Sequence, residues 1–359
     1  MNLPFEQPLP LSPVLAPVLS AVAVALAAAT LLPALAERLG WVDAAGAGEA
    51  ARKLQRRPVA AVGGTVILLG VLAGWVLLGA TGRGPDALVP GRALGQWLGA
   101  SLGAGATLFP LGAVLAVFAV GLIDDLAPRG LPPGWKLLGQ AASGALLGAP
   151  LLWSTAVTPA AALCVVLLLA LGAVVCTNAI NTFDNADGAA ASLAAVALAG
   201  SAPMLAAPVL VFLPFNLLRR AGGRRGRGEP AAYLGDSGSH LLGLFVLLTP
   251  AAWPVLALPL ADLARLCVVR ARAGGAPWVG DRRHLAHRFA AGGMPRLAVP
   301  AVLVALALPS VLLGWVGVPL TLALVALAVR RTRAPVAAGA CPGPSRLARA
   351  ARVAAERGE

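Results

Sequence analysis

The chain has 359 residues, of which 58% are apolar and 12% are charged, and its formal net charge is +13. Soluble domains carry about a quarter charged residues, so this composition excludes an ordinary soluble domain. The apolar runs are too long and too unalternating for barrel strands, which leaves an all-α, polytopic membrane protein. The four cysteines show no paired or Cys-x-x-Cys spacing, so we expect neither a disulfide framework nor a zinc site.

Eleven apolar segments predict membrane-spanning helices, and a count of ten stays open because the central segments are short. The segments are 12–36, 58–80, 97–123, 136–153, 158–178, 188–200, 204–218, 239–249, 253–270, 297–313 and 315–329. Each of the two central pairs is too short for two full crossings, since one crossing needs about 20 residues. We therefore expect two short central hairpins, made of short helices or partly re-entrant segments.

The basic residues predict the orientation in the membrane. No Lys or Arg precedes the first apolar segment, whereas Glu6 does, which argues against a signal peptide and favours an N-terminus outside the cytoplasm. Among the polar stretches, only those with Arg83 and Arg92 then carry basic residues outside the cytoplasm. Topology thus accounts for the positive charge, and we expect no nucleic acid as a partner. We predict a polytopic domain over residues 1–333, with its motifs between 40 and 296, and a basic cytoplasmic tail over 334–359.

Five carboxylates stand at the polar ends of the apolar segments. Asp124 and Asp125 lie in GLIDDL, Asp184 and Asp187 in NAINTFDNADG, and Asp236 in YLGDSGS. A carboxylate near hydrocarbon is costly unless it is paired, binds a cation or faces a watery cavity. The predicted topology places all five on the cytoplasmic face. This indicates one shared site for a divalent metal and a phosphate-bearing substrate.

A polar stripe ends the segment at 158–178, because Asn178, Asn181, Asp184 and Asp187 recur at every third position. A seam between helices is the alternative explanation. The chain offers further candidate contacts, each with a plainer structural alternative: Lys136 for phosphate or as an interfacial lysine, and Tyr233 for a base or as an interface anchor. The loop VGDRRHLAHRF suits a pyrophosphate or a sugar, or is simply a basic cytoplasmic loop.

Taken together and in this order, the segments resemble the polyprenyl-phosphate N-acetylhexosamine-1-phosphate transferases, or glycosyltransferase family 4. This superfamily includes phospho-MurNAc-pentapeptide translocase and the UDP-GlcNAc:undecaprenyl-phosphate transferases. The resemblance covers roughly residues 40–296, and its motifs are Asp43, RKLQRRPVAAVGG (52–64), GLIDDL, Lys136, NAINTFDNADG, Asn216, YLGDSGS, Asp262 and DRRHLAHR. The HLAH form and the eleven spans are closer to the UDP-GlcNAc branch than to the pentapeptide branch.

The resemblance implies transfer of a HexNAc-1-phosphate, GlcNAc-1-phosphate first among them, from a UDP-sugar to undecaprenyl or another polyprenyl phosphate. It implies release of UMP at the cytoplasmic face of a bacterial inner membrane, at the start of a lipid-linked cell-envelope glycan. The implied cofactor is Mg²⁺, with Mn²⁺ as an alternative. The implied partners are the UDP-sugar, the prenyl phosphate and the membrane, with a homodimer left open.

The resemblance also implies roles for individual residues. Asp236 would bind Mg²⁺, and Asp124 would be the base that deprotonates the lipid phosphate. The other implied catalytic carboxylates are Asp125, Asp184 and Asp187. The implied substrate contacts are Lys53, Lys136, Asn178, Asn181, Asn216, Tyr233, Arg282, Arg283, His284 and His287.

The chain departs from the family pattern at several positions. Gln55, Ala60 and Ala286 replace a histidine, a proline and a histidine, and LLRRAGGRRGRGE is inserted between Asn216 and Pro230. These departures keep an alternative open, namely a catalytically impaired relative that binds prenyl phosphate or a UDP-sugar as a sensor or assembly partner. A transporter with a carboxylate relay is disfavoured, because the acids gather at one face and not at the midplane.

Overall fold

The computed structural model describes residues 12–43, 58–80, 108–127, 130–155, 157–218, 229–272, 274 and 283–332. Its α-helices are α1 (Ser12–Leu39), α2 (Gly63–Ala80), α4 (Leu108–Leu126), α5 (Pro133–Gly148), α6 (Pro159–Phe183), α7 (Ala189–Ala199), α8 (Pro203–Leu217), α9 (Gly235–Leu248), α10 (Ala257–Arg272), α11 (Leu285–Ala291), α12 (Ala298–Leu313) and α13 (Val318–Arg331). Short 3₁₀ helices, η3 (Ala149–Trp153), η5 (Pro250–Leu256) and η6 (Gly314–Gly317), continue or link them. Strands β1 (Val42–Asp43) and β2 (Val59–Ala60) form one small antiparallel pair.

The predicted all-α, polytopic fold is confirmed. Each predicted apolar segment contains a helix, although residues 97–107 lie outside the described part of the chain. Within the described residues, six apolar helical stretches are long enough to cross a membrane: those in α1, α2, α4, α6, η5–α10 and α12–α13. The segment predicted at 58–80 becomes helical only at Gly63, because Val59 and Ala60 pair with β1.

The first central hairpin is short, as predicted, with 11 residues in α7 and 15 in α8, whereas the second contains the 23-residue stretch Pro250–Arg272, which is long enough to cross a membrane. At 1.5 Å per residue, α7 is about 17 Å long, well below the roughly 30 Å of a bilayer core. Most of its residues are buried, and it packs against α8, α9 and α12. A helix too short to span is thus covered by protein on its flanks, which is the condition under which it is tolerated at membrane depth.

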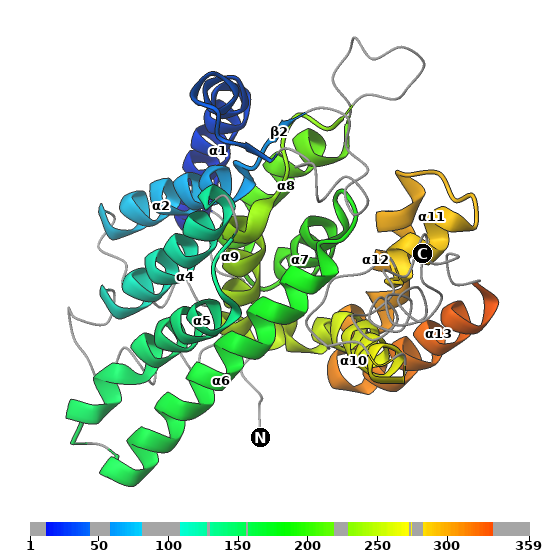
Figure 1. The fold of residues 1–359 in the computed structure, drawn as a ribbon. Coiled ribbons are helices and arrows are strands. Elements are labelled where there is room, and N and C mark those ends of the chain that lie inside the picture. Colours follow the sequence, from blue (N-terminus) through cyan, green and yellow to red (C-terminus); the bar gives the residue numbers. More distant parts are fainter. Residues whose placement is uncertain are drawn as a thin grey trace, which may run out of the picture.

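Four helices form the centre of the molecule, with α4 packed against α5 and α9, and α6 packed against the same two helices. Figure 1 shows α1, α2 and α8 on one side of this group and α10 to α13 on the other. The last apolar stretch is folded into a hairpin, because Gly314 adopts φ +60° and η6 turns the chain so that α13 packs on α12. The prediction of two separate helices there is therefore confirmed.

Candidate active site

Four helix ends meet at one end of the central group. The α4 helix ends at the acidic pair, α5 begins shortly afterwards and carries Lys136, α6 runs back and ends before Asp184, and α9 begins at Gly235. Because α4 and α6 end where α5 and α9 begin, and these helices pack together, polar side chains far apart in the sequence converge.

A single lysine ammonium joins two of these carboxylates. The Nζ of Lys136 lies 2.6 Å from Asp124 Oδ2 and 2.6 Å from Asp236 Oδ2. The other oxygen of Asp124 accepts a hydrogen bond from the backbone N–H of Leu131. Lys136 was predicted to contact phosphate, which stays a prediction; the structure places its ammonium between the two acids.

The second oxygen of Asp236 is bound from α6. Asn181 Nδ2 lies 2.9 Å from Asp236 Oδ1 and 2.9 Å from Ser239 Oγ. The Asp236 carboxylate therefore contacts side chains from both α5 and α6. This connects three of the residues that the sequence predicted as a site, Lys136, Asn181 and Asp236.

Asp125 has a different environment from its neighbour, because its carboxylate caps the N-terminus of α9. It accepts hydrogen bonds from Asp236 N (2.7 Å), Ser237 N (3.0 Å) and Ser237 Oγ (2.7 Å). Gly235 makes this approach feasible: its φ is +75°, and a Cβ there would lie 2.6 Å from Asp125 Oδ2. The first N–H groups of a helix need such acceptors. This geometry shows Asp125 holding the start of α9, and the catalytic role that the sequence predicted for it stays a prediction.

Close packing also brings α9 into place. A Cβ on Gly121 of α4 would lie 2.5 Å from Ser237 N, and one on Gly64 of α2 would lie 2.5 Å from Gly238 N. Only glycine leaves room for two helices and the start of a third at this distance. The N-terminus of α9 is thus held between α2 and α4.

The remaining two predicted carboxylates differ from each other. Burial, together with repulsion from Asp236 and Asp125, raises the pKa of Asp184 to about 8. Asp187 instead forms an ion pair with Arg296, a partner that the sequence did not indicate. Asp184 therefore interacts electrostatically with Asp236 and Asp125. Asp187 contacts Arg296, which lies in the segment before α12.

Asn216 and Tyr233 lie in the loops beside this group. The Asn216 side chain is buried, with its Oδ1 accepting from Gly188 N at 2.8 Å and its Nδ2 donating to Ala232 O at 3.1 Å. Both ends of the predicted substrate-binding amide thus hold backbone in place. The backbone of Tyr233 pairs with Ala60 and Gly63, which fixes the loop that leads into α9.

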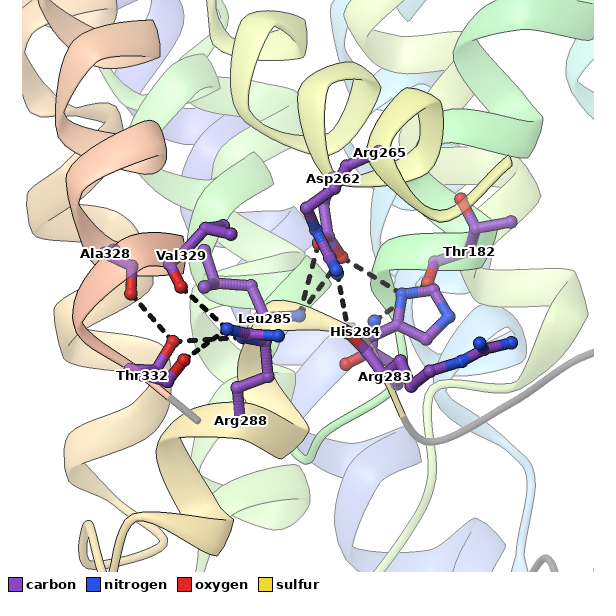
Figure 2. A network of polar contacts seen from close by, with 11 residues as sticks. Thr182, Asp262, Arg265, Arg283, His284, Leu285, Arg288, Ala328, Val329 and Thr332 are labelled. Atoms are coloured by element: carbon purple, nitrogen blue, oxygen red, sulfur yellow. Dashed lines mark hydrogen bonds and ion pairs between the residues drawn. The ribbon is translucent and has the colours of Figure 1, made fainter. Parts of the chain in front are cut away.

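A second polar cluster joins α10 to the segment that starts α11 (Figure 2). The buried Asp262 carboxylate lies 2.7 Å from Arg265 Nη2 and 3.1 Å from His284 Nδ1, and it also accepts from Leu285 N. Arg265 reaches Arg283 O at 2.6 Å. Figure 2 also draws Thr182 of α6, a helix against which α10 packs. The sequence missed Arg265, whose only signal is its i,i+3 spacing from Asp262 within an apolar segment.

Arg288 fastens α11 to the end of α13. Its Nη2 donates to Val329 O at 2.6 Å and to Thr332 O, and its Nε donates to Thr332 Oγ1. Burial lowers the pKa of this guanidinium from its ordinary value, and nearby Arg265 adds to the effect. The ring of His287 lies 6.2 Å from that of His284, whereas the predicted contacts Lys53 and Arg282 lie outside the described residues.

Two further buried residues, Gln140 and His240, were not among the predicted site residues. Gln140 Oε1 accepts from Asn178 Nδ2 at 2.6 Å, and Gln140 Nε2 lies 3.1 Å from His240 Nε2. The available signal was their spacing, since each follows a site residue, Lys136 or Asp236, by four positions. Both residues sit inside segments that the sequence presents as plain apolar helix.

The donor chemistry fits a hard divalent cation. Among the described residues no three His, Cys, Asp or Glu side chains are arranged as a preformed metal site. Mg²⁺ commonly uses one or two carboxylates together with waters and substrate phosphates, so it needs no such cage. Asp124, Asp184 and Asp236 supply oxygen donors, and the Lys136 ammonium alone does not balance their charge.

These features define a polytopic, all-α membrane protein with a carboxylate-rich site at one end of its helix bundle. Residues 107–252 match the model of a family described as glycosyl transferase family 4. The match supports the superfamily that the motifs indicated, whose members transfer sugar phosphates, and it includes every residue of the network around Asp236. No curated protein matches the chain.

Proposed function

We propose that this protein transfers a HexNAc-1-phosphate, with GlcNAc-1-phosphate as the first candidate, from a UDP-sugar to undecaprenyl or another polyprenyl phosphate. The reaction takes place at the cytoplasmic face of a bacterial inner membrane and starts a lipid-linked glycan. A phosphate oxygen of the lipid forms a bond to the phosphorus that carries the sugar, and the bond from that phosphorus to UMP breaks. The observation that carries the proposal is the convergence of Asp124, Lys136 and Asp236 within the segment that matches the family.

The residues divide the work according to their contacts. Lys136 supplies positive charge to phosphate oxygens, because its ammonium lies between the Asp124 and Asp236 carboxylates where the substrates are proposed to meet. Asp124 takes a proton from the lipid phosphate, as the carboxylate that contacts Lys136 from the end of α4. Asp236 and Asp184 would hold the metal with oxygen ligands, and Asn181 orients Asp236.

Mg²⁺ is the proposed cofactor, held by Asp236 with help from Asp184. When bound, it supplies positive charge that offsets the phosphates of both substrates. The protein's own contribution is to hold Asp236 rigidly, through Asn181 on one oxygen and Lys136 on the other.

The test is turnover by the purified chain. Radiolabelled UDP-GlcNAc and UDP-GalNAc are mixed with undecaprenyl phosphate, with Mg²⁺ or with EDTA, and the labelled lipid and UMP are measured. We expect labelled lipid and UMP to form in equal amounts, and only when lipid and Mg²⁺ are present. In Asp236→Asn we expect the turnover rate to fall about 100-fold or more. Glu37→Gln removes an exposed carboxylate of α1 that is not among the proposed site residues, and it serves as the matched control.

Two outcomes would contradict the proposal in different ways. Undiminished turnover in Asp236→Asn would reject the metal assignment while leaving the reaction standing. Saturable binding of a UDP-sugar without turnover across the panel would favour the alternative, a catalytically impaired relative that acts as a sensor or assembly partner.

A further inference from the structure

A second layer of polar side chains lies one helical turn deeper than the proposed active site, on the same three helices. The residues of the inner layer follow their outer counterparts by four positions on α5 and α9, and precede theirs by three positions on α6. Because residues three or four apart share one face of a helix, each inner residue stacks beneath an outer one. The pairs are Gln140 beneath Lys136, His240 beneath Asp236 and Asn178 beneath Asn181.

The inner layer is a continuous chain of hydrogen bonds across the three helices. Asn178 Nδ2 donates to Gln140 Oε1 at 2.6 Å, and Gln140 Nε2 lies 3.1 Å from His240 Nε2. Gln140 has an exposed fraction of 0% and His240 of 1%. Polar groups this deeply buried depend on their protein partners, since little water reaches them.

The orientation of this chain is fixed from its α6 end. Asn178 Nδ2 also donates to the backbone oxygen of Val174 at 2.8 Å, and a carbonyl oxygen can only accept. Both hydrogens of Asn178 Nδ2 are then used, so the atom of Gln140 facing Asn178 is the oxygen. Gln140 must therefore donate to His240 Nε2, which makes His240 a neutral ring with its proton on Nδ1.

His240 is an unfavourable residue for stability alone. Within the described part of the chain its Nδ1 is buried without a hydrogen-bond partner. A buried donor without a partner is costly, and an apolar side chain of similar size would avoid that cost. Within the described residues, the hydrogen bond with Gln140 is the polar contact that offsets this cost.

We propose that Gln140 and His240 are positioning residues, which set the rotation of α5 and α9 relative to α6 so that Lys136, Asp236 and Asn181 meet. A rotation of either helix that separated the outer residues would also break the inner chain, leaving buried polar groups unpaired. Buried polar contacts of this kind are known to fix register between helices. The proposal rests on the transfer reaction proposed above, so one of its tests is independent of turnover.

The first test compares two substitutions that differ only in hydrogen bonding. His240→Gln places an acceptor oxygen near the position of Nε2, whereas His240→Leu has a similar size and no acceptor. We expect kcat to fall about 10- to 100-fold in His240→Leu, with KM for the lipid phosphate nearly unchanged, because a small misplacement of reacting groups has this effect. We expect His240→Gln to recover most of kcat.

A buried leucine one turn further along α9 provides the control. Leu244 is as buried as His240 but takes no part in the polar chain, so Leu244→Ala should lower the unfolding temperature in detergent with little effect on kcat. A kcat in His240→Leu no lower than in Leu244→Ala, or no recovery in His240→Gln, would overturn the positioning role.

The second test needs no turnover. The chain has three histidines, so nitrogen NMR of the histidine-labelled protein in lipid resolves His240, and the signal missing in His240→Gln identifies it. We expect a neutral ring protonated on Nδ1 at pH 7, and a mixture of tautomers in Gln140→Leu. A charged ring, or one protonated on Nε2, in the unsubstituted protein would overturn the inner layer whether or not the transfer reaction is found.

Discussion

Replacing Asp125 by alanine separates a positioning role from a catalytic one. The carboxylate accepts from two backbone N–H groups and one hydroxyl at the start of α9. In Asp125→Ala the hydroxyl can turn to another acceptor, but the two N–H groups cannot. Each buried donor left without a partner costs about 1–3 kcal/mol, and loss of a helix N-cap costs about 1 kcal/mol. We therefore expect a loss of roughly 2–4 kcal/mol in the free energy of unfolding.

The assay is thermal unfolding of the purified protein in detergent, followed together with turnover. A loss of this size lowers the unfolding temperature by roughly 3–5 °C in a protein of this length. Turnover should fall as well, because the N-terminus of α9 carries Asp236 and loses its anchor. Asp125→Asn keeps one acceptor oxygen, and we expect it to lie between alanine and the unsubstituted chain in both measurements.

The opposite result would refute this reasoning. If Asp125 served only in catalysis, its removal would relieve repulsion with Asp236 and Asp184, and the unfolding temperature would stay unchanged or rise while turnover disappeared. A second result, unchanged stability with unchanged turnover, would show that α9 holds its place without the cap.

The remaining predictions concern the same helix ends and the second cluster. In Gly235→Ala we expect a lower unfolding temperature and lower turnover, because φ +75° costs an alanine about 1–2 kcal/mol and its Cβ would strike Asp125; an unchanged temperature would contradict the strained turn. In Asp262→Ala we expect a loss of about 3–5 kcal/mol in unfolding free energy, since Arg265 and His284 lose a buried partner, and a near-neutral effect in the same assay would reject that contact's importance. Treatment with EDTA should stop turnover without lowering the unfolding temperature, since no preformed metal cage is found among the described residues; a large drop would indicate a structural metal.

The sequence predicted the helices well because hydrocarbon demands long apolar runs, and such runs are visible in a single chain. It also predicted that Asp124, Lys136, Asn181 and Asp236 would gather, because a topology with alternating helix directions places their helix ends on one side. The contacts of Lys136 and Asn181 with Asp236 agree with that expectation.

What the sequence could not provide is the rotation of each helix and the partner that each polar group finds. Asp124 and Asp125 are adjacent and chemically identical, yet one contacts Lys136 and the other caps α9. Asn216 was predicted for substrate but holds two loops together. His240 lies in an apolar segment, and its hydrogen-bond partner Gln140 stands one hundred positions earlier in the chain. These assignments depend on tertiary contacts, which periodicity along one helix does not encode.

The electrostatics of the helix ends explain why the site lies at this junction. The C-terminal end of a helix carries partial negative charge, so the end of α4 is an unfavourable place for two carboxylates by itself. The N-terminal end of α9 carries partial positive charge, and its first N–H groups point at Asp125. The positive charge of the Lys136 ammonium compensates the Asp124 carboxylate. The end of α6 adds Asp184, for which the described part of the chain offers no such cationic partner, and burial and repulsion raise its pKa to about 8. The ionised form of Asp184 is therefore disfavoured in this arrangement, and the divalent cation proposed beside Asp184 and Asp236 would lower the free energy of that form.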